Sequence, residues 1–401
     1  MDLRCYSSCI TINLDIIKEN LKKIRSYTGG LGIIPVVKGN AYGFGTAEIG
    51  SYLAHCCGIN MIAVARLYEA IQIQDTGAES ELLILGPIPE ESLPFILRRG
   101  IQFPLFRIDF AKLVSKWAKQ LGLPSVKLHL KIETGMNRIG IRPGTELENL
   151  LAEVKNLGNL QIDGVFTHFA TSTQANQGKG NDFCRQQFEL FKIGVQQVHN
   201  AGFQPRFIHC CNTGATTWLK EAFSFCTHTR VGSLYLGYPS VDNDWNPVGV
   251  TEPASWHTKI LNINHIRPGD SCGYDRAFMP TKDATVAIIP VGYGDGYLRS
   301  LAASHAPVLI GGQRRPFVSI CMDVGFIDIT GVECHLGDQV TLFGTDYLGN
   351  SLSGIEIGHI MGESRLAMFT HISQRVGRSY IFNGQEVEAD NLCYSIASTS
   401  K

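Results

Sequence analysis

Short apolar runs rich in β-branched residues alternate with amphipathic segments through the first 240 residues of the chain. Runs of this length and composition, bounded by turn-forming residues, predict β-strands. Eight occur, at residues 32–38, 61–66, 82–87, 102–106, 126–133, 162–168, 207–212 and 229–236. Eight parallel strands with helices between them predict an α/β fold that closes as a (β/α)8 TIM-type barrel, with a doubly wound open sheet as the alternative.

Two of the intervening segments show the helical period most clearly. After Asp109, which we expect to be the N-cap, apolar residues recur on one face as far as Leu121, and Gly122 follows as a stop signal. A second apolar stripe begins at Cys184 and keeps the same period until Gly202. Helices of this kind pack one face against a sheet.

The pattern changes beyond about residue 239. Strand-like runs at 259–266, 284–291, 307–310, 316–323 and 339–344 are separated by Gly, Pro and Asp, and one helix is predicted at 354–361. We therefore expect a barrel at residues 11–240 and a mostly β domain at 241–385 that also includes residues 1–10. Residues 386–401 are predicted to form a weakly held polar tail.

Composition narrows the function without naming it. The chain has 401 residues, 44% of them hydrophobic, and 35 Lys plus Arg against 36 Asp plus Glu. This balance gives no field of one sign to attract nucleic acid or an acidic membrane, so we expect a small, locally recognised molecule as partner. No apolar run approaches about 18 residues, and the N-terminus has no secretory signal, which predicts a cytoplasmic protein.

The twelve cysteines do not indicate a disulfide framework. They are scattered along the chain, the adjacent pairs Cys56-Cys57 and Cys210-Cys211 are awkward to bridge, and no CxxC spacing occurs. We expect reduced, mostly packed thiols and no metal site.

The densest candidate for chemistry is the strand exit at residues 35–45, where an apolar run ends in Lys38 and breaks into glycines. A lysine shielded from water at the end of a barrel strand can act as a nucleophile, a Schiff-base partner or a general base. The ordinary alternative is a lysine that leaves the rim for solvent.

A second strand exit, at residues 131–140, holds Lys131 and Arg138 close to glycines that let the backbone approach a ligand. The planar, permanently charged guanidinium of Arg138 suits a carboxylate or an oxyanion. A surface ion pair is the alternative.

The last three barrel strands end in small polar residues, namely Thr167-His168-Phe169, Asn212-Thr213-Gly214 and Arg230-Val231-Gly232-Ser233. Hydroxyls and glycine N–H groups on late barrel loops can cradle a phosphate, although each residue alone is more often a turn or cap residue. His168 at the same rim is a candidate base.

Three glycine-containing segments stand out in the β domain: Ser271-Cys272-Gly273-Tyr274, residues 291–297 and Cys321-Met322-Asp323. The glycine spacing of the second segment does not indicate a nucleotide loop, because neither GxGxxG nor GxxxxGK[ST] is present and no βαβ unit follows. By periodicity alone its tyrosines would be packing or surface residues.

Together these segments resemble the alanine racemase family, pyridoxal-phosphate enzymes in which a barrel is followed by a β domain. The similarity spans nearly the whole chain, and six motifs occur in the expected order. They are Val36-Val37-Lys38-Gly39-Asn40-Ala41-Tyr42-Gly43, Thr134-Gly135-Met136-Asn137-Arg138-Ile139-Gly140, Thr167-His168-Phe169-Ala170, Arg230-Val231-Gly232, Gly292-Tyr293-Gly294-Asp295-Gly296-Tyr297 and Cys321-Met322-Asp323.

The resemblance implies that Lys38 binds pyridoxal 5'-phosphate as a Schiff base and then serves as one of two acid/base groups. Tyr274 would be the other, on the opposite face of the cofactor. Two differently placed bases are needed because inversion takes a proton from one face of Cα and returns one to the other. His168 would hydrogen-bond the phenol, and Arg230 would hold the pyridine nitrogen unprotonated.

The resemblance also implies that Arg138 contacts the phenolic oxygen of the cofactor and lies near the substrate carboxylate, together with Met322 and Tyr293. The remaining cofactor-binding residues would be Tyr42, Asn212, Thr213, Gly232 and Ser233. Lys131 matches a lysine that is carbamylated in some members. By analogy the protein is a homodimer with shared active sites, in which the tyrosine base comes from the partner subunit.

Three residues depart from the family pattern. Leu366 stands where a tyrosine is expected, Thr173 replaces an acid and Ser319 replaces an arginine. Losing both members of a charge pair leaves neither charge uncompensated. We therefore expect a wider or more apolar entrance, and a substrate other than, or beyond, alanine.

The leading hypothesis is a pyridoxal-phosphate-dependent racemase acting on alanine or on another small or broader set of amino acids. Related carbanion chemistry, such as an aldolase or an α-substituted amino-acid transformation, is one alternative. A non-catalytic pyridoxal-phosphate-binding protein is another, although such a carrier does not need a second domain that supplies Tyr274.

Overall fold

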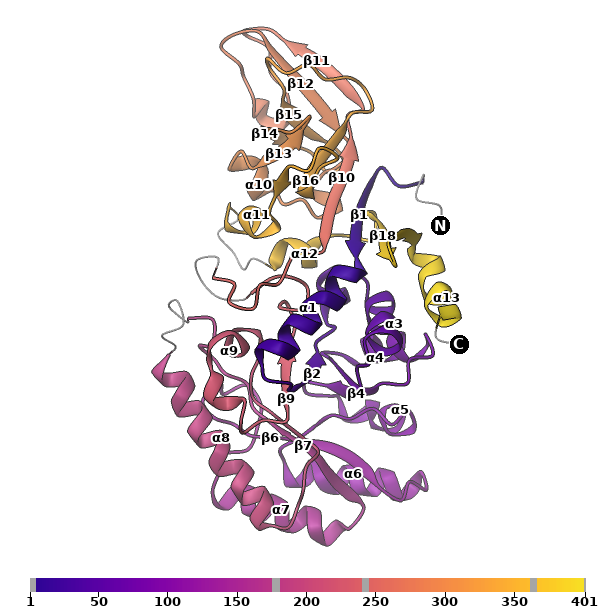
Figure 1. The fold of residues 1–401 in the computed structure, drawn as a ribbon, viewed down its shortest axis with the longest axis vertical. Helices are drawn as coiled ribbons and strands as arrows, with labels where there is room; N and C mark the ends of the chain where they lie inside the picture. The colour runs from indigo at the N-terminus through magenta and orange to yellow at the C-terminus, as the bar shows by residue number, and fades with distance from the viewer. Residues whose placement is uncertain (1–4, 175–180, 240–244, 361–365, 400–401) are drawn as a thin grey trace. The chain divides into compact units, whose positions relative to one another are not determined.

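A computed structural model describes residues 5–174, 181–239, 245–360 and 366–399. The chain divides into two compact units (Figure 1). One, here called the barrel unit, contains Lys18–Ala41 and Thr46–Thr251. The other, the sheet unit, contains Met1–Ile17, Tyr42–Gly45 and Glu252–Thr399. The predicted boundary at residues 240 and 241 lies outside the described residues.

All eight predicted barrel strands are present and run parallel. They are β2 (Gly32–Pro35), β3 (Met61–Val64), β4 (Glu81–Ile84), β5 (Pro104–Leu105), β6 (Val126–Lys131), β7 (Leu160–Phe166), β8 (Phe207–His209) and β9 (His228–Val231). All eight end before the predicted positions, because the chain leaves the ladder for the loops at the C-terminal rim.

The strands close into a barrel. Parallel ladders join β2 to β9, β3 to β4, and β5 through β6 and β7 to β8. Bridges between Val36 and Ala63 and between Leu83 and Gln102 connect these groups. Between β8 and β9, the Thr227 N–H donates to the Ile208 carbonyl at 2.9 Å. The ring of eight strands is therefore complete, and the open-sheet alternative is wrong.

Helices alternate with these strands and cover the outside, as α6, α7 and α8 do beside β6 and β7 (Figure 1). The helices are α1 (Leu14–Tyr27), α2 (Gly39–Tyr42), α3 (Thr46–Cys56), α4 (Leu67–Gln74), α5 (Leu93–Arg98), α6 (Ile108–Gln120), α7 (Thr145–Leu157), α8 (Asp182–Asn200) and α9 (Thr213–Trp218), with short 3-10 turns η2 (Glu90–Ser92) and η3 (Lys220–Ala222).

The predicted N-cap of α6 is wrong by two residues. Arg107, with extended φ and ψ of −140° and 139°, is the N-cap. Asp109 lies in the first turn, where its carboxylate interacts favourably with the positive end of the helix dipole. It also forms an ion pair with Arg107 at 2.7 Å.

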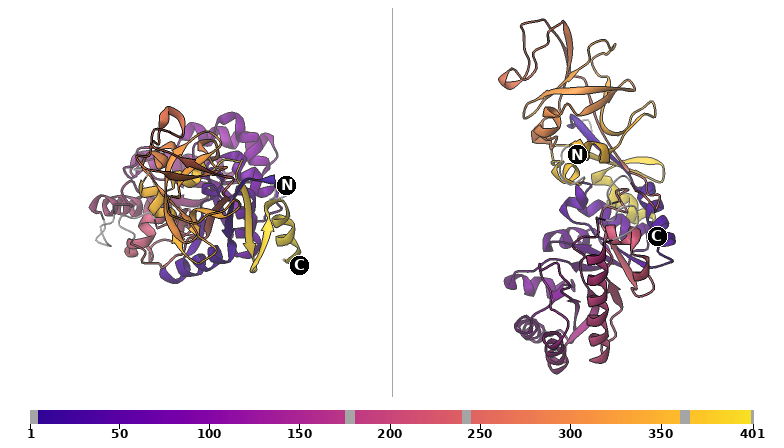
Figure 2. Two further views of the ribbon diagram at one scale, coloured as in Figure 1. Left: turned by 90° about the horizontal axis from the view of Figure 1, so that it is seen from above. Right: turned by 90° about the vertical axis from the view of Figure 1, so that its left-hand side faces the viewer.

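The sheet unit is built around one large, mostly antiparallel sheet. Its strand order is β11-β12-β15-β14-β13-β16-β10-β1-β18-β19, with β17 paired to β16. The strands are β1 (Ser8–Asn13), β10 (Ala254–Lys259), β11 (Asn262–Ile266), β12 (Ala284–Ile289), β13 (Pro307–Ile310), β14 (Gln313–Ile320), β15 (Gly325–Asp328), β16 (Gln339–Thr345), β17 (Ser351–Leu352), β18 (Gly377–Phe382) and β19 (Gln385–Glu388). β1 pairs with β10 and β18, and Figure 2 shows it among these later strands.

Short helices complete the sheet unit: η4 (Tyr274–Arg276), η5 (Tyr293–Asp295), α10 (Arg299–Ala303), α11 (Gly354–Ile360), α12 (Ala367–His371) and α13 (Ala389–Thr399). The predicted helix at 354–361 corresponds to α11, and its last residue lies outside the described part of the chain. Most of the expected polar tail instead forms β19 and α13. Leu392 and Ile396, four residues apart on α13, are fully buried, which explains why this segment is ordered.

One predicted strand, at residues 259–266, is two strands. β10 begins earlier, at Ala254, and a break after Lys259 separates it from β11. Ala254, Trp256 and Thr258 are buried while the residues between them are partly exposed, so β10 has the period of a strand but lacks a continuous apolar run.

The state of the cysteines and the hydropathy of the helices can also be compared with the sequence. All twelve cysteines are free thiols. Among the described residues, no helix is both long and apolar enough to cross a membrane.

Candidate active site

The candidate residues of the barrel unit follow the C-terminal ends of its strands. Lys38 follows β2, Arg138 follows β6 and His168 follows β7. The pair Asn212 and Thr213 follows β8, and Gly232 and Ser233 follow β9. Since the strands are parallel and the barrel is closed, these residues share one rim, which is where barrels of this type carry out chemistry.

The chain beyond Lys38 forms a left-handed helical turn. Gly39, Asn40, Ala41 and Tyr42 have φ values of 60°, 57°, 51° and 54°. Left-handed backbone costs an L-residue roughly 1–2 kcal/mol, and strain of this kind gathers at functional sites. Two hydrogen bonds hold the turn: the Gly39 N–H donates to Glu69 Oε1 at 2.8 Å, and the Thr46 N–H donates to Asn40 Oδ1 at 3.1 Å.

The amine of Lys38 is easier to deprotonate than an ordinary lysine. Its side chain is exposed at the rim, but the surrounding barrel removes enough water for desolvation to be the main cause of a lowered pKa. Arg138 and Arg230 lower the pKa further, and Glu69 opposes them.

Lys131, the last residue of β6, is 2% exposed, and its Nζ lies 4.8 Å from the centre of the Phe166 ring. Burial, followed by the charge of Arg230, lowers its pKa well below the usual lysine value. The charge of Arg138 also lowers the pKa of Lys131, as it does those of Lys38, His168 and Arg230. The rim therefore carries more positive than negative charge.

Arg230 is 2% exposed, and both of its Nη atoms donate hydrogen bonds. Its Nη1 donates to His209 Nδ1 at 2.8 Å, and its Nη2 donates to the Thr167 carbonyl at 2.9 Å and to His168 Nδ1 at 3.2 Å. Burial lowers the pKa of Arg230 to about 10, which leaves it charged at neutral pH. Burial and neighbouring cations lower the pKa of His168 well below its usual value, so its ring is neutral.

The predicted phosphate loops pack against each other. The Gly232 N–H donates to Thr213 Oγ1 at 3.0 Å, which joins the loop after β9 to the start of α9. Asn212 is the N-cap of α9 and accepts the Ala215 N–H at 3.1 Å. Thr213 and Ser233 are buried.

Tyr274, Tyr293 and Met322 belong to the sheet unit, as does Tyr42. Tyr274 is 71% exposed and starts a turn in which Asp275 and Arg276 have positive φ values of 57° and 56°. Arg276 braces this turn through its Nε, which donates to Ser271 Oγ at 3.1 Å. The loops that carry Tyr293 and Met322 are joined by the Gly294 N–H, which donates to the Met322 carbonyl at 2.9 Å.

A depression of about 400 Å³ lies beside Tyr274 in the sheet unit. Arg299, His305 and Ser319 contribute to its lining. Ser319 packs so closely on Gly273 that a Cβ at position 273 would collide with its hydroxyl. The residue at position 319 thus contacts the turn that presents Tyr274.

Comparisons with known proteins agree with this arrangement. Residues 12–239 match the family described as "Alanine racemase, N-terminal domain", and residues 254–380 match "Alanine racemase, C-terminal domain". The chain is 32% identical over 386 residues to alanine racemase 2 of Caldanaerobacter subterraneus subsp. tengcongensis, covering 95% of this chain and 97% of that protein. The chain belongs to the alanine racemase family.

Other members of the alanine racemase family match equally broadly. The alanine racemase of Clostridium perfringens strain ATCC 13124 is 32% identical over 98% of this chain and 100% of its own length. Among solved structures, the alanine racemase of Clostridium difficile 630 has a TM-score of 0.87 and 28% identity, covering 95% of this chain and 97% of its own. That of Bacillus anthracis with bound L-Ala-P has a TM-score of 0.85 and 28% identity, covering 96% and 97%. The chain is an enzyme of the racemase class.

The three departures from the family pattern occupy different surroundings. Thr173 is exposed in the loop after β7, and Leu366 is partly buried at the N-cap of α12. Ser319 is 6% exposed at the depression beside Tyr274. The described geometry therefore links Ser319, of these three, most directly to a predicted catalytic residue.

Sequence reasoning missed two residues that the structure connects to the site. His129 on β6 and His209 on β8 are fully buried inside the barrel and lie 3.0 Å apart, Nδ1 to Nε2. The signal available was the alternation Lys127, His129, Lys131 along one strand, which places polar side chains on one face.

Proposed function

We propose that this chain is a pyridoxal-phosphate-dependent amino-acid racemase that uses a two-base mechanism. The observation that supports it is the rim itself, where a lysine of lowered pKa stands among permanently charged guanidinium groups. Excess positive charge with neutral, buried hydrogen-bonding groups beside it fits an anionic, aldehyde-bearing cofactor. When bound, pyridoxal phosphate supplies an electron sink that makes the Cα proton of an amino acid acidic.

Lys38 would hold the cofactor and exchange a proton with one face of the substrate Cα. A lowered pKa increases the neutral fraction of the amine at physiological pH, and only the neutral amine is a nucleophile or a base. Arg138, exposed at the same rim, is placed to contact the cofactor's phenolic oxygen and the substrate carboxylate.

Arg230 would face the pyridine nitrogen. A guanidinium that stays charged has no lone pair to accept a proton and does not readily donate one, so it would keep that nitrogen unprotonated. The same guanidinium occupies His168 Nδ1, which leaves the proton of the neutral ring on Nε2. That N–H would hydrogen-bond the phenolic oxygen of the second base.

Tyr274 would be this second base, supplied by the partner subunit of a homodimer. Its large exposed fraction in one chain agrees with a side chain that completes a site elsewhere. Tyr42, Thr213, Gly232 and Ser233 would hold the phosphate with Asn212 supporting their loop, and Met322 and Tyr293 would help bind the substrate. The cytoplasm, where free amino acids are available, is the proposed location.

The proposal is tested with single enantiomers of amino acids in D2O. We expect the purified protein to show a visible absorbance band that is absent in Lys38→Ala, and to incorporate deuterium at Cα while converting either enantiomer of alanine to a racemic mixture. Lys38→Ala and Tyr274→Phe should each lower kcat by at least about 100-fold. Failure to label or racemise any of the twenty amino acids would overturn the proposal.

A further inference from the structure

A chain of ring nitrogens runs from Arg230 into the barrel interior. A guanidinium can only donate hydrogen bonds, so the 2.8 Å contact between Arg230 Nη1 and His209 Nδ1 makes Nδ1 the acceptor. A neutral imidazole that accepts at Nδ1 carries its proton on Nε2. Arg230 therefore fixes the tautomer of His209.

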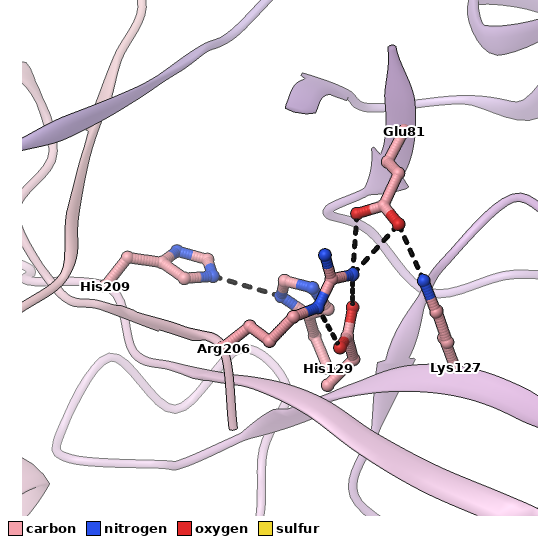
Figure 3. Close-up of polar contacts among 6 residues, drawn as sticks. Glu81, Lys127, His129, Arg206 and His209 are labelled. Atoms are coloured by element: carbon pink, nitrogen blue, oxygen red, sulfur yellow. Dashed lines mark hydrogen bonds and ion pairs between the residues drawn. The ribbon is translucent and has the colours of Figure 1, made fainter. Parts of the chain in front are cut away.

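His129 accepts a hydrogen bond from His209. The distance from His209 Nε2 to His129 Nδ1 is 3.0 Å, and Figure 3 shows the two rings meeting through these atoms. Since His209 Nε2 donates, His129 Nδ1 accepts, and the proton of His129 must lie on its own Nε2. That nitrogen is buried and has no hydrogen-bond partner within the described part of the chain.

Both rings are neutral, which keeps the direction of these hydrogen bonds fixed. Burial lowers the pKa of His129 to about 3, and burial together with the charge of Arg230 lowers that of His209 well below its usual value. A second proton on His129 would make two donors face each other across 3.0 Å, and a second proton on His209 would do the same across the 2.8 Å contact with Arg230. The hydrogen bonds from Arg230 through His209 to His129 therefore allow a single arrangement of protons.

Ionised groups lie beyond His129, toward the N-terminal ends of the strands (Figure 3). Asp163 on β7 has a fully buried side chain and accepts from Arg206 Nε at 2.7 Å. Arg206 also pairs with Glu81 at 2.8 Å, and Lys127 does so at 2.7 Å. The charge of Asp163 partly opposes the effect of burial on the pKa of His129, because a nearby carboxylate favours the protonated form of the ring.

Packing alone is the competing explanation for His129. Its ring centre lies 5.6 Å from that of Phe207 and 6.2 Å from that of Phe166. An apolar side chain of similar size would keep such contacts. It would also leave the Nε2–H of His209 buried without an acceptor, which hydrogen-bonding groups in protein interiors rarely tolerate.

We propose that His129 is a positioning residue for the cofactor site. By accepting the Nε2–H of His209, it holds the ring that in turn orients the guanidinium of Arg230 at the rim. The role of that guanidinium toward the pyridine nitrogen rests on the function proposed above. The hydrogen bonds from Arg230 to His209 and from His209 to His129 do not depend on that function.

Two substitutions separate hydrogen bonding from packing. His129→Asn is smaller but offers Oδ1 near the position of Nδ1, whereas His129→Leu fills more of the space and offers no acceptor. His228→Leu is a matched control, because His228 also lies in the barrel and packs on Phe207, with ring centres 4.7 Å apart, but bonds Thr227 instead of the chain to Arg230. All are made in the full-length protein.

The first readout is the nitrogen chemical shifts of the His209 ring, assigned by comparison with His209→Asn. We expect the Nε2 shift of the wild type and of His129→Asn to show a hydrogen-bonded Nε2–H. In His129→Leu the proton should stay on Nε2, because Arg230 still donates to Nδ1, but the shift caused by the hydrogen bond should be lost. The second readout is pyridoxal phosphate affinity after removal of the cofactor by dialysis against hydroxylamine. His129→Leu should bind at least about tenfold more weakly, while His129→Asn and His228→Leu stay within about threefold of the wild type.

Two results would overturn the proposal: equal affinity and an unchanged Nε2 shift of His209 in His129→Leu, or weaker binding by His129→Asn than by His129→Leu, which would show a packing role. If the wild type binds no pyridoxal phosphate, the proposed function fails. The nitrogen shifts still decide whether His129 orients His209.

Discussion

We expect the buried histidines of the barrel to make its stability sensitive to acid. His129 has a pKa of about 3 in the folded protein, far below the ordinary value of 6.5, because burial penalises its charged form. Between these two values the unfolded chain takes up a proton that the folded chain does not, so the free energy of unfolding falls as the pH falls below about 6.5.

This dependence can be measured at one residue. Each unit of pH in that window costs about 1.4 kcal/mol for one such group. We expect His129→Asn, which does not titrate, to lose less stability than the wild type when urea unfolding is compared at pH 6.5 and pH 5. Parallel pH dependences in the two proteins would contradict a depressed pKa at His129.

The specificity prediction also belongs to a single residue. An arginine at position 319 would extend into the depression beside Tyr274 and remove space from it. We expect Ser319→Arg to lower kcat/KM for amino acids larger than alanine by at least about tenfold relative to alanine. Ser351→Arg adds the same charge at an exposed position on β17 that does not line the depression, and it should not change this ratio. An unchanged ratio in Ser319→Arg would show that the residue at position 319 does not determine substrate specificity.

Single residues were predictable from sequence where a motif surrounds them. Lys38 and Arg138 follow apolar strands and precede glycines, so their position at the rim could be predicted. His129 and His209 could not be found in this way, because a histidine within an apolar strand resembles any core residue. Their contact exists only once β6, β7 and β8 have paired, since they lie on β6 and β8 with β7 between them.

At the scale of elements, the left-handed turn Gly39–Tyr42 is a source of strain beside the proposed nucleophile. Ala41 is fully buried at φ 51°. A β-branched residue is strongly disfavoured in this conformation. We expect Ala41→Val to lower the free energy of unfolding by about 2–3 kcal/mol and to weaken pyridoxal phosphate binding.

Ala41→Gly is the control for the turn. Glycine adopts positive φ without steric cost, although it also gains entropy in the unfolded chain, so its stability should stay within about 1 kcal/mol of the wild type. Chemical denaturation of the three proteins provides the comparison. A stable Ala41→Val protein would show that the turn is not strained.

Elements were predictable to the extent that one local pattern describes them. Most of the barrel strands are short, mainly apolar runs because both faces of each strand are covered, and all eight were found. β10 was misplaced because its alternation of buried and partly exposed residues includes Ser255, His257 and Thr258. The order of α13 depends on tertiary contacts of Leu392 and Ile396, which no local pattern specifies.

At the scale of the whole molecule, the proposed shared site makes a prediction about mixtures. Lys38→Ala and Tyr274→Phe should each be inactive alone. If the two bases of one site come from different subunits, refolding the two variants together restores activity to about a quarter of the wild type, because half of the dimers are mixed and one of their two sites is intact. Mixtures that stay inactive would show that Lys38 and Tyr274 of one site do not come from different subunits.

The N-terminal strand is held by segments from the far end of the chain. β1 has β10 on one side and β18 on the other, and both partners are encoded after the entire barrel. During synthesis on the ribosome, β1 emerges before both partners. It can pair with β10 only after the barrel has been made, and its other edge stays unpaired until β18 appears. Premature termination after the barrel would therefore release a protein in which β1 exposes unpaired backbone N–H and C=O groups. Such a protein would be bound by chaperones or degraded by proteases.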